Sequence, residues 1–284
     1  MINVVYCGDK GIEDGLIISV LSLAKQTREA LGVYVLTMRL EYDCSVYMPV
    51  SERTIAVLGE RIKKVNPESF IRLIDVGEAF LAAPPIANMT TRFTPYCMLR
   101  LYMDQVEGLP DRVLYLDNDV ICHADFSDFY HQDISDVEFV GVHDFYGRWT
   151  FIWREYKRSY VNSGVLLMNM AKIRETGLIA RCRDVCAQQR LFLPDQTALN
   201  KCVTAKRIAP RQYNEQRQCR PDTVFRHFST SFRVLPWPRV ISVKPWQIDR
   251  MHRVLHLHDY DDLLREYQHI KNQVTLKVYR YENN

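Results

Sequence analysis

The chain has 284 residues, 47% hydrophobic and 25% charged, a globular balance that supplies a sizeable core. Lys and Arg total 37 against 34 for Asp and Glu, and a net charge of +3 is too small to indicate a nucleic-acid-binding protein. No apolar run approaches the length of a membrane span, and the N-terminal residues lack the pattern of a signal peptide.

Alternating strand and helix patterns occupy the N-terminal part of the chain. Their succession is typical of βαβ units and therefore of a parallel sheet. The pattern predicts strands at 2–7, 33–36 and 70–76, and helices at 14–31 and 51–65, the second with Ser51 as its N-cap. We therefore expect an α/β fold with a mainly parallel central sheet.

The regular pattern continues to about residue 205. It predicts a helix that begins at Thr94-Pro95, strands at 113–116, 138–143 and 161–169, and a long helix at 172–190. Beyond residue 205, clustered Arg, Pro and Trp residues replace the periodicity, and no repeat or linker is evident. We expect a single domain over 1–284, with a core at 1–205 and a less regular C-terminal extension at 206–284.

The eight cysteines are spread through the chain, and none forms a Cys-x-x-Cys pair. Several lie inside apolar runs, and no secretory signal is evident, so we expect reduced core residues and a cytoplasmic protein. Cys182 and Cys186 share one face of a predicted helix, but packing is favoured over metal binding there.

Two carboxylates follow the apolar strand Val113–Leu116, in the order Asp117, Asn118, Asp119. The carboxyl ends of parallel strands form the edge at which open α/β sheets bind ligands. Carboxylates so close together repel each other, and a divalent cation relieves that repulsion, since carboxylate oxygens suit Mg²⁺ and Mn²⁺. The motif therefore predicts a metal site that holds a phosphorylated substrate.

Six segments, in order along the chain, resemble those of bacterial members of glycosyltransferase family 8. They are Val-Val-Tyr-Cys-Gly-Asp at 4–9, Pro-Tyr-Cys-Met-Leu-Arg-Leu at 95–101, Leu-Tyr-Leu-Asp-Asn-Asp-Val at 114–120, Val-Asn-Ser-Gly-Val-Leu-Leu-Met-Asn at 161–169, Pro-Asp-Gln-Thr-Ala-Leu-Asn at 194–200 and Lys-Pro-Trp at 244–246. The resemblance implies a retaining enzyme with a GT-A (Rossmann-like) nucleotide-sugar-binding domain. Its core would bind the nucleotide sugar, and its C-terminal extension would cover the donor and acceptor side.

The resemblance also implies roles for individual residues in binding the donor. Asp9 would accept a hydrogen bond from uracil, Asn118 would touch the ribose, and Lys244 would reach the phosphates. The other implied donor-binding residues are Cys7, Gly8, Gly11, Arg100, Asn162 and Ser163. Ordinary structural roles remain open for several of them: a turn carboxylate for Asp9, a buried salt bridge for Arg100.

Asp195 and Gln196 are the implied catalytic residues. Asp195 would anchor sugar hydroxyls, and Gln196 would lie beneath the anomeric carbon, although simple N-capping is an alternative for Asp195. A neutral amide is a poor covalent catalyst compared with the carboxylates of retaining glycosidases. We therefore expect the acceptor to attack from the face that UDP leaves.

One feature departs from the family pattern. The family places a metal-binding histidine a few residues before its Lys-Pro-Trp motif, whereas His227 stands 17 residues before Lys244. An inserted loop that contains Pro236, Trp237 and Pro238 would account for the gap. His227 is favoured as the third metal ligand beside Asp117 and Asp119, and His256 and His258 remain alternatives.

The expected function is transfer of glucose or galactose from a UDP-sugar to a glycan or lipid-linked saccharide acceptor, with Mn²⁺ or Mg²⁺ as cofactor. One alternative is a haloacid-dehalogenase-like phosphatase, whose nucleophile motif is also Asp-x-Asp but normally follows the first strand. Another is a non-catalytic nucleotide-sugar-binding protein. Peripheral membrane contact through the basic, aromatic segment 271–281 is less favoured than a solvated terminus. The oligomeric state is not indicated.

Overall fold

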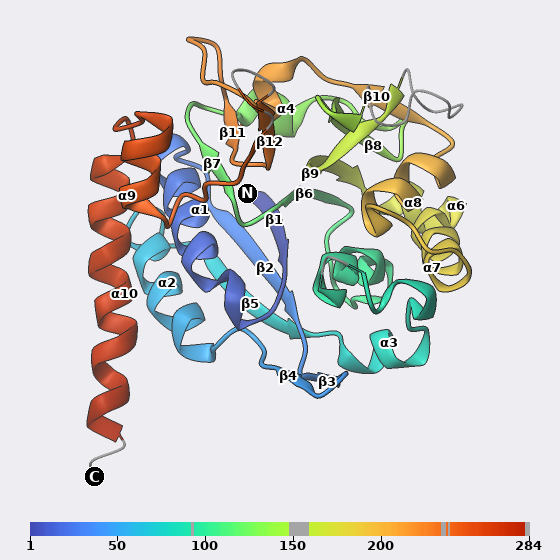
Figure 1. The fold of residues 1–284 in the computed structure, drawn as a ribbon, viewed down its shortest axis with the longest axis horizontal. Coiled ribbons are helices and arrows are strands. Elements are labelled where there is room, and N and C mark those ends of the chain that lie inside the picture. Colours follow the sequence, from blue (N-terminus) through green and yellow to red (C-terminus); the bar gives the residue numbers. More distant parts are fainter. Residues whose placement is uncertain (92–93, 148–158, 234–236, 238, 282–284) are drawn as a thin grey trace.

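A computed structural model of the chain describes residues 1–91, 94–147, 159–233, 237 and 239–281. Its centre is a seven-stranded sheet with strand order β10-β8-β9-β6-β1-β2-β5 (Figure 1). These strands are Ile2–Cys7 (β1), Leu31–Thr37 (β2), Phe70–Asp75 (β5), Arg112–Leu116 (β6), Phe139–His143 (β8), Val161–Asn169 (β9) and Lys206–Ile208 (β10). Only β9 runs antiparallel to its neighbours, so the predicted mainly parallel α/β fold is confirmed.

The remaining strands of the described residues form three short antiparallel pairs. They are Leu40–Tyr42 (β3) with Ser45–Tyr47 (β4), Val120–Cys122 (β7) with Phe225–His227 (β11), and Ser231–Arg233 (β12) with Arg239–Ile241 (β13). The α-helices are Glu13–Gln26 (α1), Glu52–Lys63 (α2), Gly77–Ala82 (α3), Ser127–His131 (α4), Met170–Thr176 (α6), Leu178–Gln188 (α7), Pro194–Cys202 (α8), Ile248–Arg250 (α9) and Asp261–Tyr281 (α10). The 3-10 helices are Lys10–Ile12 (η1), Ile86–Asn88 (η2), Pro95–Gln105 (η3) and Arg211–Asn214 (η5), and Met251–Leu255 (η6) is a π-helical turn.

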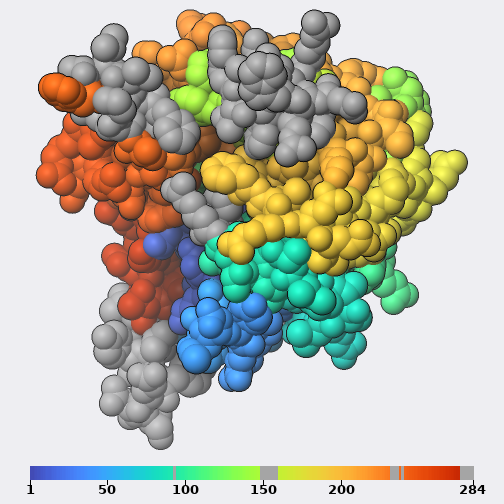
Figure 2. All heavy atoms as spheres, turned by 45° about the vertical axis from the view of Figure 1, so that its right-hand side comes forward, coloured from blue at the N-terminus to red at the C-terminus, as the bar shows by residue number. Residues whose placement is uncertain are grey.

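Successive residues of the central strands point to opposite faces of the sheet, and each face has its own core. Val4 and Tyr6 pack with α1 and α2, whereas Val5 packs with η3 and α7. The two-sided burial explains why these strands are almost continuously apolar. In the space-filling view, the η3 segment and the α7–α8 region lie side by side on one flank of the molecule (Figure 2).

Two predicted helix boundaries are wrong. The helix expected at 14–31 ends at Gln26, because Thr27 is extended and Leu31 already belongs to β2. The helix expected at 172–190 is two helices, since Gly177 adopts φ = 67° and separates α6 from α7. Only glycine adopts that left-handed backbone region at little cost, so the chain turns there.

The C-terminal extension contains a long helix that the sequence pattern did not reveal. This helix, α10, packs against α1 and α2 on the flank of the sheet (Figure 1). The expected solvated terminus at 271–281 is the end of α10, and the side chains of Lys277, Tyr279, Arg280 and Tyr281 lie outside the described residues. None of the helices in the described part of the chain has the length and apolar character to cross a bilayer. The eight cysteines are free thiols.

Candidate active site

Two carboxylates and one imidazole meet at the carboxyl end of β6. Asp117 and Asp119 follow that strand, and β11 pairs with β7 so that His227 lies opposite Val120. The Nε2 atom of His227 lies 3.2 Å from Asp119 Oδ1 and 3.8 Å from Asp117 Oδ2. One ligand atom from each of the three residues lies within 4.8 Å of the others.

The two alternative histidines lie elsewhere. His258 stacks on His252 with 4.2 Å between ring centroids, and both contact Asp261 at the start of α10. His256 lies between these two histidines in the chain, in a left-handed backbone conformation. Of the three histidines considered as metal ligands, only His227 lies beside Asp117 and Asp119.

The donor set of Asp117, Asp119 and His227 suits a divalent cation. Carboxylate oxygens favour Mg²⁺ and Mn²⁺, and the imidazole nitrogen shifts the preference toward Mn²⁺. Gly164 makes room for the cluster, because a Cβ there would clash with the His227 ring and come within 2.7 Å of Asp117 Oδ2. The residues present therefore fit the metal that the sequence motif implies.

Lys244 reaches the same cluster. Its Nζ atom contacts Asp119 and lies 3.1 Å from the carbonyl oxygen of Phe228. The 16 residues between His227 and Lys244 include the antiparallel pair β12–β13, which returns the chain to the site. Within the expected loop, Pro236 and Pro238 lie outside the described residues. Burial alone would raise the pKa of Asp119, but Lys244 and His227 outweigh it and hold that pKa below its usual range.

Arg100, carried by η3, joins the metal carboxylates to the second half of the site. Its guanidinium is buried, lies 2.8 Å from Asp117 Oδ1 and 3.2 Å from Asp195 Oδ2, and donates to the carbonyl oxygen of Ser163 at 2.7 Å. The hydroxyl of Tyr115 donates to Asp117 at 2.9 Å, and its ring lies under the guanidinium. Arg100 thus has the buried salt bridges that the sequence left as an alternative, and they lie inside the site.

Asp195 and Gln196 occupy the first turn of α8. Asp195 is its second residue rather than its N-cap, and it accepts a 3.1 Å hydrogen bond from the Ser163 hydroxyl. The side-chain oxygen of Gln196 accepts from the Ser163 backbone N–H at 3.0 Å. Burial raises the pKa of Asp195, although the nearby Arg100 cation opposes this shift.

Asn162 links the site to two polar residues that the sequence analysis missed. Its amide donates to Asp144 at 2.8 Å and accepts from Asn214 at 2.9 Å. Asp144 also accepts from Gln196 at 3.1 Å, and the Asn214 oxygen lies 3.1 Å from Nδ1 of His227. Asp144 directly follows β8, so the strand-end argument used for Asp117 could have found it. Asn214 carries no comparable local signal.

The first strand ends beside the motif strand. Since β1 pairs with β6, the turn that holds Gly8 and Asp9 lies at the same sheet edge as Asp117. The Asp9 carboxylate accepts from the Gly11 backbone N–H at 2.9 Å and begins η1. Asp9 therefore has the turn role that the sequence left open. Burial raises the pKa of the Cys7 thiol to about 12, so it is uncharged at neutral pH.

Asn118 packs against the first turn of α1. A Cβ on Gly15 would come within 2.5 Å of the Asn118 amide and 2.7 Å of the Trp246 ring. The Lys-Pro-Trp segment is thus anchored against α1 next to the carboxylate motif, which places Asn118, Trp246 and Lys244 on one side of the site.

A mainly parallel sheet with a carboxylate pair at the end of a central strand is the architecture of GT-A glycosyltransferases. The fold matches an active-site mutant of LgtC with a TM-score of 0.67 at 17% identity, covering 96% of each chain. It also matches galactosyltransferase LgtC in complex with donor and acceptor sugar analogs, with a TM-score of 0.62 at 19% identity and 96% coverage of each chain. The chain belongs to glycosyl transferase family 8, whose family model matches residues 3–250.

Sequence relatives agree with that family. Glycosyltransferase GlyF of Streptococcus pneumoniae serotype 4 is 33% identical over 150 residues, which cover 51% of this chain and 34% of GlyF. The lipopolysaccharide 1,2-glucosyltransferase of Escherichia coli K12 is 26% identical over 223 residues, covering 75% of this chain and 62% of the relative. The chain therefore spans less than two thirds of the length of either relative.

The resemblance drawn from the six sequence segments is confirmed. The phosphatase alternative is not favoured, because it explains neither the family match nor the buried Arg100 that joins Asp117 to Asp195. Its nucleophile would normally follow the first strand, whereas Asp117 follows β6.

Proposed function

We propose that the protein is a metal-dependent retaining glycosyltransferase that moves glucose or galactose from a UDP-sugar to a glycan or lipid-linked saccharide. One observation carries the proposal: Arg100 bridges Asp117 of the metal cluster and Asp195 of the α8 pair, at 2.8 and 3.2 Å. The buried guanidinium of Arg100 thus fixes the carboxylate at the diphosphate end of the proposed donor site relative to the carboxylate at the sugar end. The named activities of the relatives, a glucosyltransferase and a galactosyltransferase, support a hexose.

The proposed donor lies along the sheet edge from β1 to α8. Asp9 would accept from uracil, with Cys7, Gly8 and Gly11 around the base and ribose. Asn118 would bind the ribose, Lys244 the diphosphate, and Asn162, Ser163 and Arg100 the sugar side. A cation held by Asp117, Asp119 and His227, Mn²⁺ or Mg²⁺, would act as a Lewis acid for the departing UDP.

The proposed reaction exchanges one bond at the anomeric carbon for another on the same face. The acceptor oxygen bonds to that carbon, the bond to the UDP oxygen breaks, and the acceptor proton passes to the departing phosphate. Asp195 is held by Arg100 and Ser163, which suits it to positioning sugar hydroxyls rather than to attack. The amide of Gln196, fixed by Ser163, would stabilise positive charge at the anomeric centre.

The C-terminal extension contributes to the proposed donor site. His227 comes from β11, and Lys244 follows β13. The C-terminal extension at 206–284 would therefore supply one metal ligand and the phosphate-binding lysine. We place the protein in the cytoplasm, in keeping with its eight free thiols.

The test is a screen of UDP-sugars for metal-dependent UDP release, with and without glycan acceptors. UDP-glucose or UDP-galactose should be turned over with Mn²⁺, and chelation should abolish turnover. Metal-dependent UDP binding without turnover of any donor, in the presence of acceptors, would instead favour the non-catalytic nucleotide-sugar-binding protein. An α-linked donor that gives a β-linked product would refute retention.

A further inference from the structure

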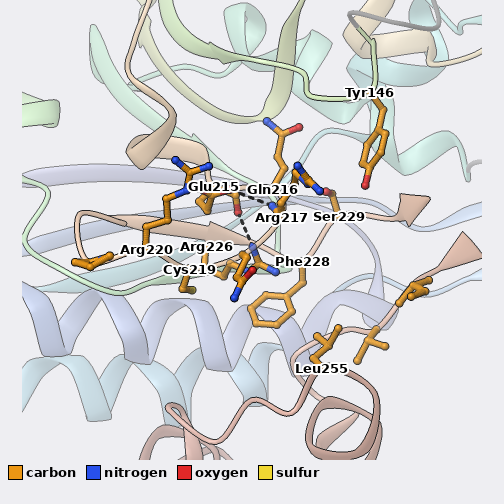
Figure 3. Close-up of a pocket in the computed structure, with 14 residues that line it drawn as sticks. Tyr146, Glu215, Gln216, Arg217, Cys219, Arg220, Arg226, Phe228, Ser229 and Leu255 are labelled. Atoms are coloured by element: carbon orange, nitrogen blue, oxygen red, sulfur yellow. Dashed lines mark hydrogen bonds and ion pairs between the residues drawn. The ribbon is translucent and has the colours of Figure 1, made fainter. Parts of the chain in front are cut away.

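A polar cavity of about 450 Å³ lies against β11, on the face of the strand from which Arg226 and Phe228 project. Its walls come from the turn between η5 and β11, from β13 and from η6. In the view of Figure 3, Tyr146 lies above and Leu255 below, Arg217 and Arg226 lie at heights between them, and Arg220 lies to the left. Its volume falls within the range of small-molecule sites, roughly 300–1,000 Å³.

The cavity wall carries excess positive charge. Three arginines, Arg217, Arg220 and Arg226, face one acidic residue, Glu215. The Glu215 carboxylate is already engaged at 2.5 Å by Arg211, which also contacts Asp222 at 2.8 Å. Arg220 lies farther from Glu215, at 3.8 Å. The positive charge of the cavity is therefore not neutralised by its own lining.

Two polar atoms in the cavity wall are buried without a partner. Within the described part of the chain, neither Nε of Arg226 nor Oγ of Ser229 has a hydrogen-bond partner. Arg226 is only 7% exposed, it donates a weak 3.4 Å hydrogen bond to the Glu215 carbonyl, and its guanidinium lies over the Phe228 ring. A buried, unsatisfied guanidinium N–H is costly, and an anionic oxygen is its strongest partner.

The cavity shares its wall with the proposed active site. Arg226 precedes His227, and the Phe228 carbonyl that follows accepts from Lys244 at 3.1 Å. Gln216 hydrogen-bonds the Phe145 N–H and the His143 carbonyl at 2.9 Å each. Asp144 lies between Phe145 and His143 in the chain and accepts a hydrogen bond from Gln196. A ligand in the cavity would thus be separated from the metal cluster by β11, because Arg226 and Phe228 point to the face of that strand opposite to His227.

We propose that this cavity binds a phosphate group carried by the saccharide acceptor. The assignment of the ligand to the acceptor rests on the proposed glycosyltransferase function, whereas the anion site itself rests on the arginines and the two unpartnered atoms. Arginine forks suit the several oxygens of a phosphate, and the Ser229 hydroxyl adds a neutral donor. The remaining volume accommodates sugar next to the phosphate.

The experiment titrates inorganic phosphate into the full chain, in EDTA, by calorimetry. Wild type should bind phosphate saturably, and Arg226→Met should weaken binding by about tenfold or more. Ser229→Ala removes only one oxygen and should weaken binding in the same direction, which keeps the test valid if Arg226→Met fails to fold. Arg265→Met changes an exposed arginine on α10 and is the matched control, with unchanged affinity.

Further arms identify the ligand. Glucose 6-phosphate should bind more tightly than inorganic phosphate or glucose, and Lys244→Ala should keep phosphate affinity, since Lys244 belongs to the donor side. Equal binding by wild type and both cavity variants, loss of binding in Lys244→Ala, or equal affinity for acetate would each overturn the proposal. Equal affinity for phosphate and glucose 6-phosphate would mean an adventitious ion only. Failure of the proposed function would be recognised by a different result: wild-type protein would not bind UDP in the presence of Mn²⁺.

Discussion

Lys244 donates a hydrogen bond to the carboxylate of Asp119, 125 residues earlier in the chain. The contact joins the Lys-Pro-Trp segment to the carboxylate motif, so the cation proposed for the diphosphate lies against a carboxylate proposed for the metal. Negative charge that develops on departing UDP would therefore be stabilised by both Lys244 and the proposed metal ion, which would lie close to each other.

Asp119→Asn should abolish metal-dependent UDP binding. The amide keeps the size of the carboxylate but removes a charge from the donor set, and loss of even an outer partner of a metal ligand costs roughly 10–100-fold. We expect a decrease of more than about 100-fold, measured by calorimetry with UDP and Mn²⁺. Asp261→Asn alters the separate His252–His258–Asp261 cluster and is the matched control. Unchanged Mn²⁺-dependent binding by Asp119→Asn would remove the basis of the metal assignment.

His227→Ala should also weaken Mn²⁺ and UDP binding, because it removes the third donor of the cluster. His258→Ala should leave both affinities unchanged, since His258 contacts Asp261 instead. Parallel titrations of the two variants with Mn²⁺, with and without UDP, compare them directly. If His258→Ala lost binding and His227→Ala did not, the third ligand would be misassigned.

Gly164→Ala should disrupt the cluster without altering any charge. The new methyl group would collide with the His227 ring and lie within 2.7 Å of Asp117 Oδ2, so both side chains must move. We expect UDP affinity with Mn²⁺ to fall by about tenfold or more. Gly59→Ala, in α2 and away from the site, meets a single methyl group of Ile71 at 3.0 Å and is the control for a glycine replacement. Normal UDP affinity in Gly164→Ala would show that the close packing of His227 and Asp117 against residue 164 is not required for binding.

Asp195 should make stability depend on pH. Its pKa is raised above the ordinary value of 3.8 by burial, so the folded state binds this proton more tightly than the unfolded state. The stabilisation is fully present below the unfolded pKa and is lost as pH rises through the folded pKa. Asp195→Asn should therefore lose less stability than wild type over that interval, measured from urea midpoints at several pH values. If the stability of wild type and of Asp195→Asn changed with pH in parallel, the raised pKa of Asp195 would be contradicted.

Asp9 should set the preference for uridine. A site built to pair with a polar group discriminates strongly against ligands that lack the partner, and uracil presents a ring N–H. Thermal shifts with Mn²⁺ should be largest for UDP among UDP, GDP, ADP and CDP, and Asp9→Ala should reduce that preference. Because Asp9 also caps η1, circular dichroism must show that the variant is folded. A preference for GDP in wild type would contradict the assignment.

Much of the fold and part of the site were predictable because their signals are local. The apolar run that ends at Asp117, the glycine turn after β1 and the Ser51 cap are set by neighbours in sequence, and all three occur in the structure. Helix ends were less predictable: only the tertiary structure shows that Leu31 belongs to a central strand rather than to α1.

By itself, the sequence determined the residue types and order of the motif segments, hence the family and the sheet edge that carries Asp117 and Asp119. Only the tertiary structure decided which histidine joins them, because the β7–β11 pairing brings His227 to the cluster across more than a hundred residues. It also decided the places of Asn214 and Lys244, whose partners Asn162 and Asp119 are 52 and 125 residues away in the chain. Such contacts depend on how strands pair and helices pack, and no local pattern encodes them.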